Sequence, residues 1–94
     1  MYVISYDISS DKLRNKVAKV LEGYGVRIQY SVFECRINEK KCKELYGKLM
    51  KLTQDMTEGS ICFYFICGKC EGKIRTIGHI TTKYEKILED IIVV

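Results

Sequence analysis

The stretch Met1-Tyr2-Val3-Ile4-Ser5-Tyr6-Asp7 decides the fold. Five of the six residues before Asp7 are apolar or aromatic, and the run ends at a single carboxylate. A run so rich in β-branched and aromatic side chains is typical of a short buried strand. The residues that follow, Ile8-Ser9-Ser10-Asp11, suit a turn and a helix cap. We therefore expect Asp7 at a strand-to-helix junction, where a carboxylate can hold a hard cation or can simply begin a loop.

The composition is that of one small globular domain. The chain has 94 residues, of which 47% are hydrophobic and 30% charged, and this balance excludes a disordered protein. It contains no apolar run of about 18 residues and no charged leader before an apolar run, so we expect a cytoplasmic protein without membrane contact. Its five cysteines are an odd number with no secretory signal, and we expect most of them to be reduced.

The positive charge is concentrated in the first half of the chain. Residues 1–54 contain 11 lysines and arginines against 6 acidic residues, which gives +5, whereas residues 55–94 contain 5 against 6, which gives −1. A basic half-chain indicates a polyanionic partner such as nucleic acid. The total of +4 is common among ordinary domains, so charge alone does not identify that partner.

Two segments carry the apolar stripe of an amphipathic helix. In residues 11–24 and 39–53, apolar side chains recur at helical spacing and lysines occupy the opposite face. Ser10 or Asp11 can cap the first helix, and Asn38 can cap the second. The expected buried stripes are Leu13, Val17, Val20, Leu21 and Tyr24 in the first helix, and Cys42, Leu45, Tyr46, Leu49 and Leu52 in the second.

Residues 26–37 contain two strand patterns that are out of phase. Every second residue is apolar from Val26 to Val32, and from Phe33 onward the alternate positions are apolar instead. Because side chains alternate strictly along a strand, this change requires a bulge, a sharp bend or a break into two strands. We expect one of these near Ser31.

The second half of the chain predicts further strands. Residues 60–67 form a near-continuous apolar run, which is typical of a strand covered on both faces. The other expected elements are a loop at 68–72, a weaker strand at about 73–78, a short helix within 83–90 and a terminal strand at 91–94. The resulting order, β-α-β(β)-α-β-β, predicts an α+β sandwich of ferredoxin-like type in a single domain over residues 1–94.

The expected layers do not balance in one copy of the chain. Two helices can cover only one face of the sheet, although the strands at 1–6 and 60–67 are apolar on both faces. No remaining element can cover the second face. We therefore expect a homodimer packed sheet against sheet, in which the strand at 91–94 pairs with the partner subunit.

Cys67-Gly68-Lys69-Cys70 is a CxxC motif. A structural zinc site needs two such pairs, and Cys35 and Cys42 do not form the second one. A redox site needs the pair at a helix N-terminus after a strand, whereas here we expect the motif to enter a loop that contains glycine. Both metal binding and redox chemistry are therefore disfavoured.

Asp7 is the candidate catalytic and metal-binding residue, with Arg14, Lys16 and Arg27 as candidate nucleic-acid contacts. No Ser-His-Asp arrangement, Walker loop or dinucleotide fingerprint occurs in the sequence. Mg²⁺ commonly takes one or two carboxylates and completes its octahedron with waters and phosphate oxygens. One chain offers one suitable carboxylate, and a two-fold axis beside Asp7 would supply the second from the partner subunit.

Three segments share a specific combined spacing. They are Tyr6-Asp7-Ile8, Leu13-Arg14-Asn15-Lys16-Val17 and Gly25-Val26-Arg27-Ile28-Gln29-Tyr30-Ser31-Val32-Phe33-Glu34, and the match continues through Gly59-Ser60-Ile61, Tyr64 and Gly78. Over nearly the whole chain, these segments resemble the CRISPR-associated endonuclease family two (Cas-two). The resemblance implies a ferredoxin-like homodimer, one Mg²⁺ (or Mn²⁺) between the two copies, and phosphodiesterase activity on RNA or double-stranded DNA. It also implies a place beside the larger Cas-one integrase in spacer acquisition.

The resemblance also implies residue roles. By position, Asp7 matches the metal aspartate of the family, while Arg14, Arg27 and Phe33 match other recurrent polar and aromatic positions, and Tyr6 is a supporting neighbour. Two positions depart from the pattern. Lys16 stands where some members have Arg, which keeps the charge but loses a bidentate phosphate contact. Cys62 replaces an Arg that often follows Ser-Ile, which removes one cation.

Two functions follow from these observations. In one, the protein is a Mg²⁺-dependent endonuclease acting through Asp7. In the other, it is a non-catalytic dimer that grips double-stranded DNA by its phosphates and bridges integrase subunits. The lysine-rich faces and the scarcity of catalytic groups favour the second in the cell, and the metal aspartate favours cleavage in vitro.

Overall fold

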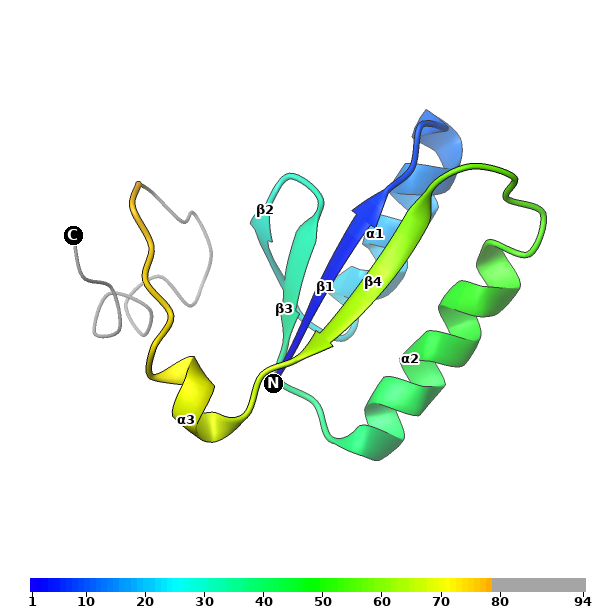
Figure 1. Ribbon diagram of the computed structural model, residues 1–94. Helices are drawn as coiled ribbons and strands as arrows, with labels where there is room; N and C mark the ends of the chain where they lie inside the picture. Colours follow the sequence, from blue (N-terminus) through cyan, green and yellow to red (C-terminus); the bar gives the residue numbers. More distant parts are fainter. Residues whose placement is uncertain (79–94) are drawn as a thin grey trace.

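The computed structural model of the chain describes residues 1–78. An antiparallel sheet of four strands packs with two long helices and one short one (Figure 1). The α+β class expected from the sequence is confirmed. The elements are β1 (Tyr2–Asp7), α1 (Asp11–Glu22), β2 (Val26–Gln29), β3 (Val32–Cys35), α2 (Glu39–Leu52), β4 (Ser60–Phe65) and α3 (Gly68–Glu71).

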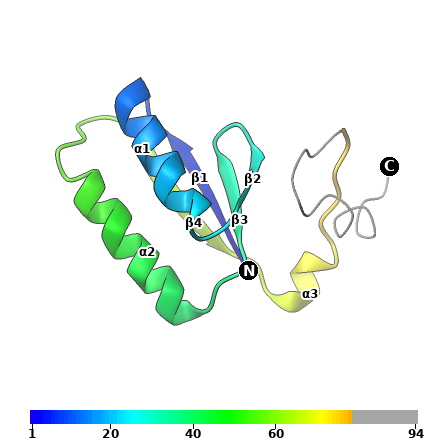
Figure 2. The ribbon, with the colours of Figure 1, turned by 180° about the vertical axis from the view of Figure 1, so that it is seen from behind.

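The strand order is β2-β3-β1-β4, which places β1 inside the sheet between β3 and β4. All pairs are antiparallel, with Ile4 opposite Phe33 in β3 and opposite Phe63 in β4. Both long helices lie on one side of the sheet (Figure 2). Because β1 lies inside the sheet with a strand on each side, most of its residues are apolar or aromatic.

Both long helices begin at the caps that the sequence predicts. The Ser10 hydroxyl accepts a hydrogen bond from the backbone N–H of Leu13, and the Asn38 side chain accepts one from Lys41 N–H at 2.8 Å. These bonds satisfy donors that the first helical turn leaves free. The buried core between the helices and the sheet consists of Ile4, Tyr6, Ile8, Val17, Ala18, Leu21, Phe33, Cys35, Leu45 and Leu49.

The phase change near Ser31 is confirmed. The chain turns at residues 30–31, so that β2 and β3 form a hairpin, and the β2–β3 register also shifts between Arg27 and Gln29. The two patterns belong to two strands, and the bulge re-aims the side chains of the edge strand.

Several sequence-based expectations are wrong. The segment expected as a loop at 68–72 contains α3, whose turn is closed by a 2.9 Å hydrogen bond from Glu71 N–H to the Cys67 carbonyl. No strand forms at 73–78, where the isoleucines lie three residues apart and Ile77 is 87% exposed. The fourth strand ends at Phe65 rather than residue 67. The elements expected at 83–90 and 91–94 lie outside the described residues.

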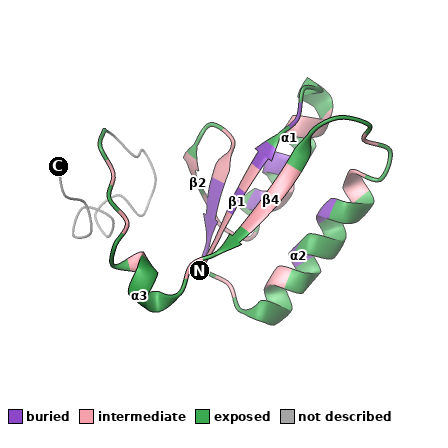
Figure 3. Cartoon of the chain, in the orientation of Figure 1, coloured by how far each residue is buried: buried purple, intermediate pink, exposed green. Residues whose placement is uncertain are grey.

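Side-chain burial also departs from expectation along α2 and β4 (Figure 3). Tyr46 is 53% exposed although it was expected in the buried stripe of α2, because it lies at the rim of the sheet against Phe63. Tyr64 and Phe65 are also largely exposed, so β4 is not covered on both faces within one copy. Within residues 1–78, every helix is too short or too polar to span a bilayer.

Candidate metal centre and nucleic-acid interface

Asp7 ends β1 and points into solvent. Since Tyr6 faces the helices and side chains alternate along a strand, Asp7 belongs to the face of the sheet opposite the helices. Within residues 1–78 its carboxylate makes no hydrogen bond or ion pair, and α1 begins four residues later. The strand-to-helix junction expected for this residue is confirmed, and its carboxylate oxygens are free to accept a ligand.

The backbone around Asp7 is fixed by a close approach of Gly59. Asp7 pairs with Ser60 of β4, and the preceding Gly59 has φ = +102°. A Cβ atom at Gly59 would lie 2.5 Å from the Asp7 carbonyl oxygen, so a side chain there would collide with the strand end. Gly59 therefore positions Asp7, because a residue with a side chain would fit neither this φ nor this close approach.

Arg14 lies close to the same strand end but not in contact with Asp7. Its Nη1 donates a 2.9 Å hydrogen bond to the Ile8 carbonyl, and its other terminal nitrogen pairs with Asp11. The guanidinium also lies over the Tyr30 ring, 5.9 Å from its centre. These contacts hold the guanidinium near the junction while part of it remains exposed.

Arg27 lies on the other side of the sheet from Asp7. Its register partner is Phe33, and its guanidinium carbon lies 5.3 Å above the Phe33 ring on the face that the helices cover. Phe33 in turn stacks on Tyr6, with ring centres 6.3 Å apart. Burial raises the pKa of Tyr6, which keeps this phenol neutral at physiological pH. Tyr6 and Phe33 are core residues, and Arg27 packs on Phe33 at the edge of the sheet.

The predicted site residues therefore divide into two groups. The structure brings Arg14, Arg27, Tyr6 and Phe33 to the β2 side of the junction, and leaves Asp7 alone on the uncovered face. Lys16 is exposed on α1 and contacts neither group through an ion pair among the described residues. In this part of the chain, no three acidic, cysteine or histidine side chains gather as metal ligands would.

The face that carries Asp7 is open and mixed in character. Over residues 1–78 no helix covers it, and Val3, Ser5, Val32 and Cys62 are only half-buried there. Figure 1 views the sheet from this side, with α1 behind it. A face of this kind is suited to packing against another surface.

A family comparison identifies the chain. Residues 1–74 match the family model described as CRISPR associated protein Cas2. The chain belongs to the Cas2 family. It is 50% identical over 68 residues to a Synechocystis protein named CRISPR-associated endoribonuclease Cas2 3, a match that covers 72% of this chain and 73% of the relative.

Solved structures agree with the Cas2 fold. Cas2 of Streptococcus pyogenes superposes with a TM-score of 0.71 at 27% identity, covering 82% of this chain and 98% of that one. A chain of a structure titled as a partial Cas6-RT-Cas1–Cas2 complex gives a TM-score of 0.72 at 30% identity, over 81% of this chain and 88% of that one. The ferredoxin-like type of fold inferred from the sequence is consistent with both.

The structure shows where Cys62, one departure from the family pattern, lies in the sheet. Cys62 lies opposite Ser5 in the register, on the same face of the sheet as Asp7. Its side chain is half-buried and cannot supply the cation that an arginine would bring to the neighbourhood of Asp7. Positive charge near the strand end comes instead from Arg14.

Proposed function

We propose that this chain is a metal-dependent endonuclease of CRISPR spacer acquisition that works as a homodimer. In the proposal, the Asp7 carboxylates of two copies hold one Mg²⁺ (or Mn²⁺), and the dimer hydrolyses phosphodiester bonds of RNA or double-stranded DNA. The observation that carries the proposal is the solvent-facing Asp7 carboxylate, which has no protein partner among residues 1–78 and a backbone fixed by Gly59.

The donor set of one chain fits half of a Mg²⁺ site. An exposed carboxylate is a hard oxygen ligand, and Mg²⁺ keeps several waters when it binds one or two such groups. A second copy packed on the open face would add the second carboxylate and would cover Val3, Val32 and Tyr64. The uncovered face and the incomplete ligand set are both explained by the same homodimer.

The residues of the chain suit slow hydrolysis of phosphodiester bonds. A bound Mg²⁺ would polarise the phosphate and lower the pKa of a coordinated water. Asp7 holds the ion, and Arg14 presents its guanidinium beside the strand end, where it can bind a phosphate oxygen and stabilise its developing charge. Arg27 extends this basic surface at the β2 edge. Among the described residues no general base accompanies Asp7, so we expect slow turnover.

A nuclease assay tests this proposal. Wild type and Asp7→Asn are incubated with matched RNA and duplex DNA, in Mg²⁺, in Mn²⁺ and in chelator, with Asp55→Asn as the matched control at another exposed aspartate. We expect cleavage by wild type and by the control with either metal, a rate lower by about 100-fold or more for Asp7→Asn, and no cleavage in chelator. Full cleavage by purified Asp7→Asn would remove the catalytic assignment.

A second candidate function, an architectural DNA-binding dimer beside Cas1, is favoured by the exposed lysines of α2. Lys40, Lys41, Lys43, Lys48 and Lys51 are all exposed, and a solved neighbour is titled as a complex of Cas1 and Cas2. Phosphate contacts by such lysines release counterions, so duplex affinity should fall steeply with salt.

The lysine proposal has its own test. Lys40→Ala and Lys51→Ala remove cations that make no ion pair within residues 1–78, and each should reduce the salt slope by about 1. Lys43→Ala is the control, since this lysine already pairs with Glu39 at 3.7 Å and should change the slope less. A flat salt response of the wild type would contradict phosphate-driven binding. Spacer acquisition retained by Asp7→Asn would assign the cellular function to binding rather than cleavage.

A further inference from the structure

The CxxC motif lies in a setting that its sequence did not predict. The chain leaves β4 at Phe65, Cys67 is extended (φ −71°, ψ 167°) and caps α3, and Cys70 lies within that helix. Both cysteines are exposed and neither is in a disulfide. The objection that the motif runs into a loop is therefore wrong, because the pair follows a strand and brackets a single helical turn.

Cys67 and Cys70 bracket one helical turn, which brings their Cα atoms within the range that a disulfide spans. In an ideal helix, Cα atoms three residues apart lie about 5 Å from each other. Disulfides span Cα separations of roughly 4.4–6.8 Å, so little backbone movement is needed to close one. A Cβ added at Gly68, the residue after Cys67, would meet no atom within 4 Å, so this side of the turn is open.

The two thiols are electronically unequal. The Cys67 side chain does not cap α3 with a hydrogen bond of good geometry. Its pKa is nevertheless lowered, first by the nearby backbone N–H of Cys70 and then by the Cys70 thiol. The same interaction raises the pKa of Cys70. Cys67 is thus suited to attack as the thiolate, and Cys70 to follow as the resolving thiol. By contrast, burial raises the pKa of Cys35 to about 11, which makes that thiol inert.

We propose that Cys67 and Cys70 form a thiol–disulfide exchange site that reacts with low-molecular-weight disulfides. The Cys67 thiolate attacks one sulfur of the small disulfide, forms a mixed disulfide and releases one small thiolate. Cys70 then loses its proton to solvent and attacks the Cys67 sulfur, releasing the second small thiol. Two protein thiols are oxidised to one intramolecular disulfide, and one small disulfide is reduced to two thiols. This site is independent of Asp7 and of nucleic acid.

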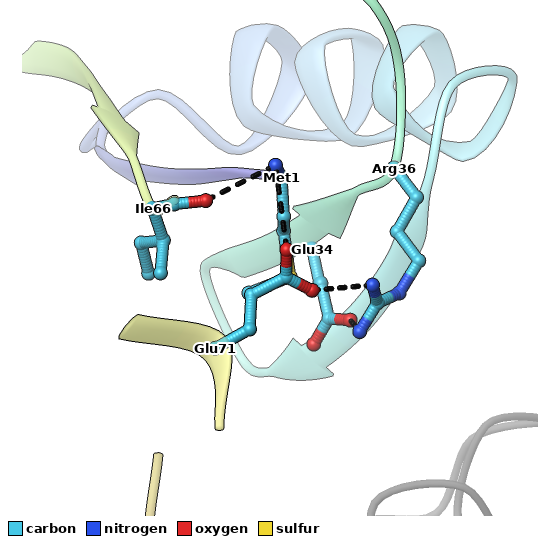
Figure 4. Close-up of polar contacts among 5 residues, drawn as sticks. All are labelled: Met1, Glu34, Arg36, Ile66 and Glu71. Carbon is cyan, nitrogen blue, oxygen red and sulfur yellow. Dashed lines mark hydrogen bonds and ion pairs between the residues drawn. The ribbon is translucent and has the colours of Figure 1, made fainter. Parts of the chain in front are cut away.

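An ion-pair bridge holds the reactive turn on the sheet. Glu71, the residue after Cys70, accepts a 2.5 Å hydrogen bond from Arg36, and Arg36 also lies 3.1 Å from the buried Glu34 of β3 (Figure 4). The Met1 N–H₃⁺ group is 3.9 Å from the other Glu71 oxygen. This bridge orders α3 before any reaction, so the folded chain should close the disulfide more readily than an unfolded one.

The test is a redox titration of the full chain in buffers of reduced and oxidised glutathione, quenched by alkylation and measured by intact mass and peptide mapping. We expect one reversible Cys67–Cys70 disulfide, with an equilibrium constant about tenfold larger in the native chain than in guanidinium chloride. Cys70→Ser should accumulate a glutathione adduct on Cys67, whereas Cys67→Ser should react more slowly at Cys70. Cys42→Ser is the control and should behave as wild type.

A further variant tests whether the bridge to Arg36, and not the CxxC motif alone, favours the disulfide. Glu71→Gln weakens the bridge to Arg36, so the equilibrium constant for disulfide formation in the native chain should fall toward the value in guanidinium chloride. Glu58→Gln is an exposed control outside the bridge and should leave this constant unchanged. The proposal is overturned if the native and denatured constants are equal, if another cysteine takes the disulfide, or if Cys70 proves the faster nucleophile.

Discussion

A carboxylate lies near each end of β1, one from β1 itself and one from the neighbouring β3, and the surroundings of the two are opposite. At one end, Asp7 is exposed and has no partner among residues 1–78. Toward the other end, Glu34 lies opposite Val3 with only 3% of its surface exposed, and Arg36 connects it to Glu71. A buried and paired acid has its charge already balanced by the protein, so it serves the fold. An exposed carboxylate such as that of Asp7, whose backbone is held in place, remains free to bind a ligand and can therefore serve function.

The largest expected effect is on activity at the Asp7 end. Asp7→Asn keeps the size of the side chain and removes its charge, and we expect cleavage to fall by about 100-fold or more. Because the carboxylate makes no contact within the described residues, the free energy of unfolding should change by less than about 0.5 kcal/mol. Cleavage rates and urea unfolding at one fixed protein concentration measure both quantities. A destabilisation above about 1 kcal/mol would show that Asp7 is structural after all.

The opposite result is expected at Glu34. Glu34→Ala removes a buried carboxylate and leaves Arg36 with one partner fewer, so we expect the free energy of unfolding to fall by about 2–3 kcal/mol. The cleavage rate per folded molecule should stay within about twofold of wild type. Urea unfolding and activity assays on the same preparations check this pair of outcomes. An activity loss as large as that of Asp7→Asn would end the division of roles between the two ends.

Gly59 sharpens the comparison because it joins stability and function at the Asp7 end. Gly59→Ala places a Cβ 2.5 Å from the Asp7 carbonyl oxygen at a positive φ, and we expect a loss of about 1–2 kcal/mol together with reduced cleavage. Gly47→Ala is the matched control. Gly47 lies within α2 with nothing within 4 Å of the new Cβ, so the same substitution should stabilise by about 0.5–1 kcal/mol. Equal effects at the two glycines would contradict the positioning role of Gly59.

Much of this fold is encoded locally and could be predicted from the sequence. The caps at Ser10 and Asn38 depend on residues within one helical turn, and the break near Ser31 follows from strict side-chain alternation. The same holds for Asp7, whose place at the end of a buried run is a property of seven consecutive residues. Short-range chemistry of this kind is visible without knowledge of the packing.

The parts that sequence reasoning missed depend on contacts between distant residues. α3 is anchored through Glu71 to Arg36, which is 35 residues away in the chain, and no local pattern marks that pairing. Strand register places Arg27 and Asp7 on opposite faces of the sheet, which their positions in the sequence do not show. The exposure of Tyr46 likewise depends on how the middle of α2 lies against Phe63 of β4. Each of these features depends on tertiary structure, which a local sequence pattern does not show.

The smallest expected effect concerns the bridge that anchors α3. A double-mutant cycle of Arg36→Ala and Glu71→Ala should give a coupling free energy of about 0.5–1 kcal/mol, because the Arg36 side chain is 38% exposed and water screens the pair. Raising the salt concentration should reduce this coupling. The control cycle uses Lys43 and Glu39, a more exposed pair at 3.7 Å, whose coupling should be smaller. If the bridge couples no more strongly than this surface pair, then Glu71 does not hold α3 on the sheet, and Arg36 alone balances the charge of the buried Glu34 in β3.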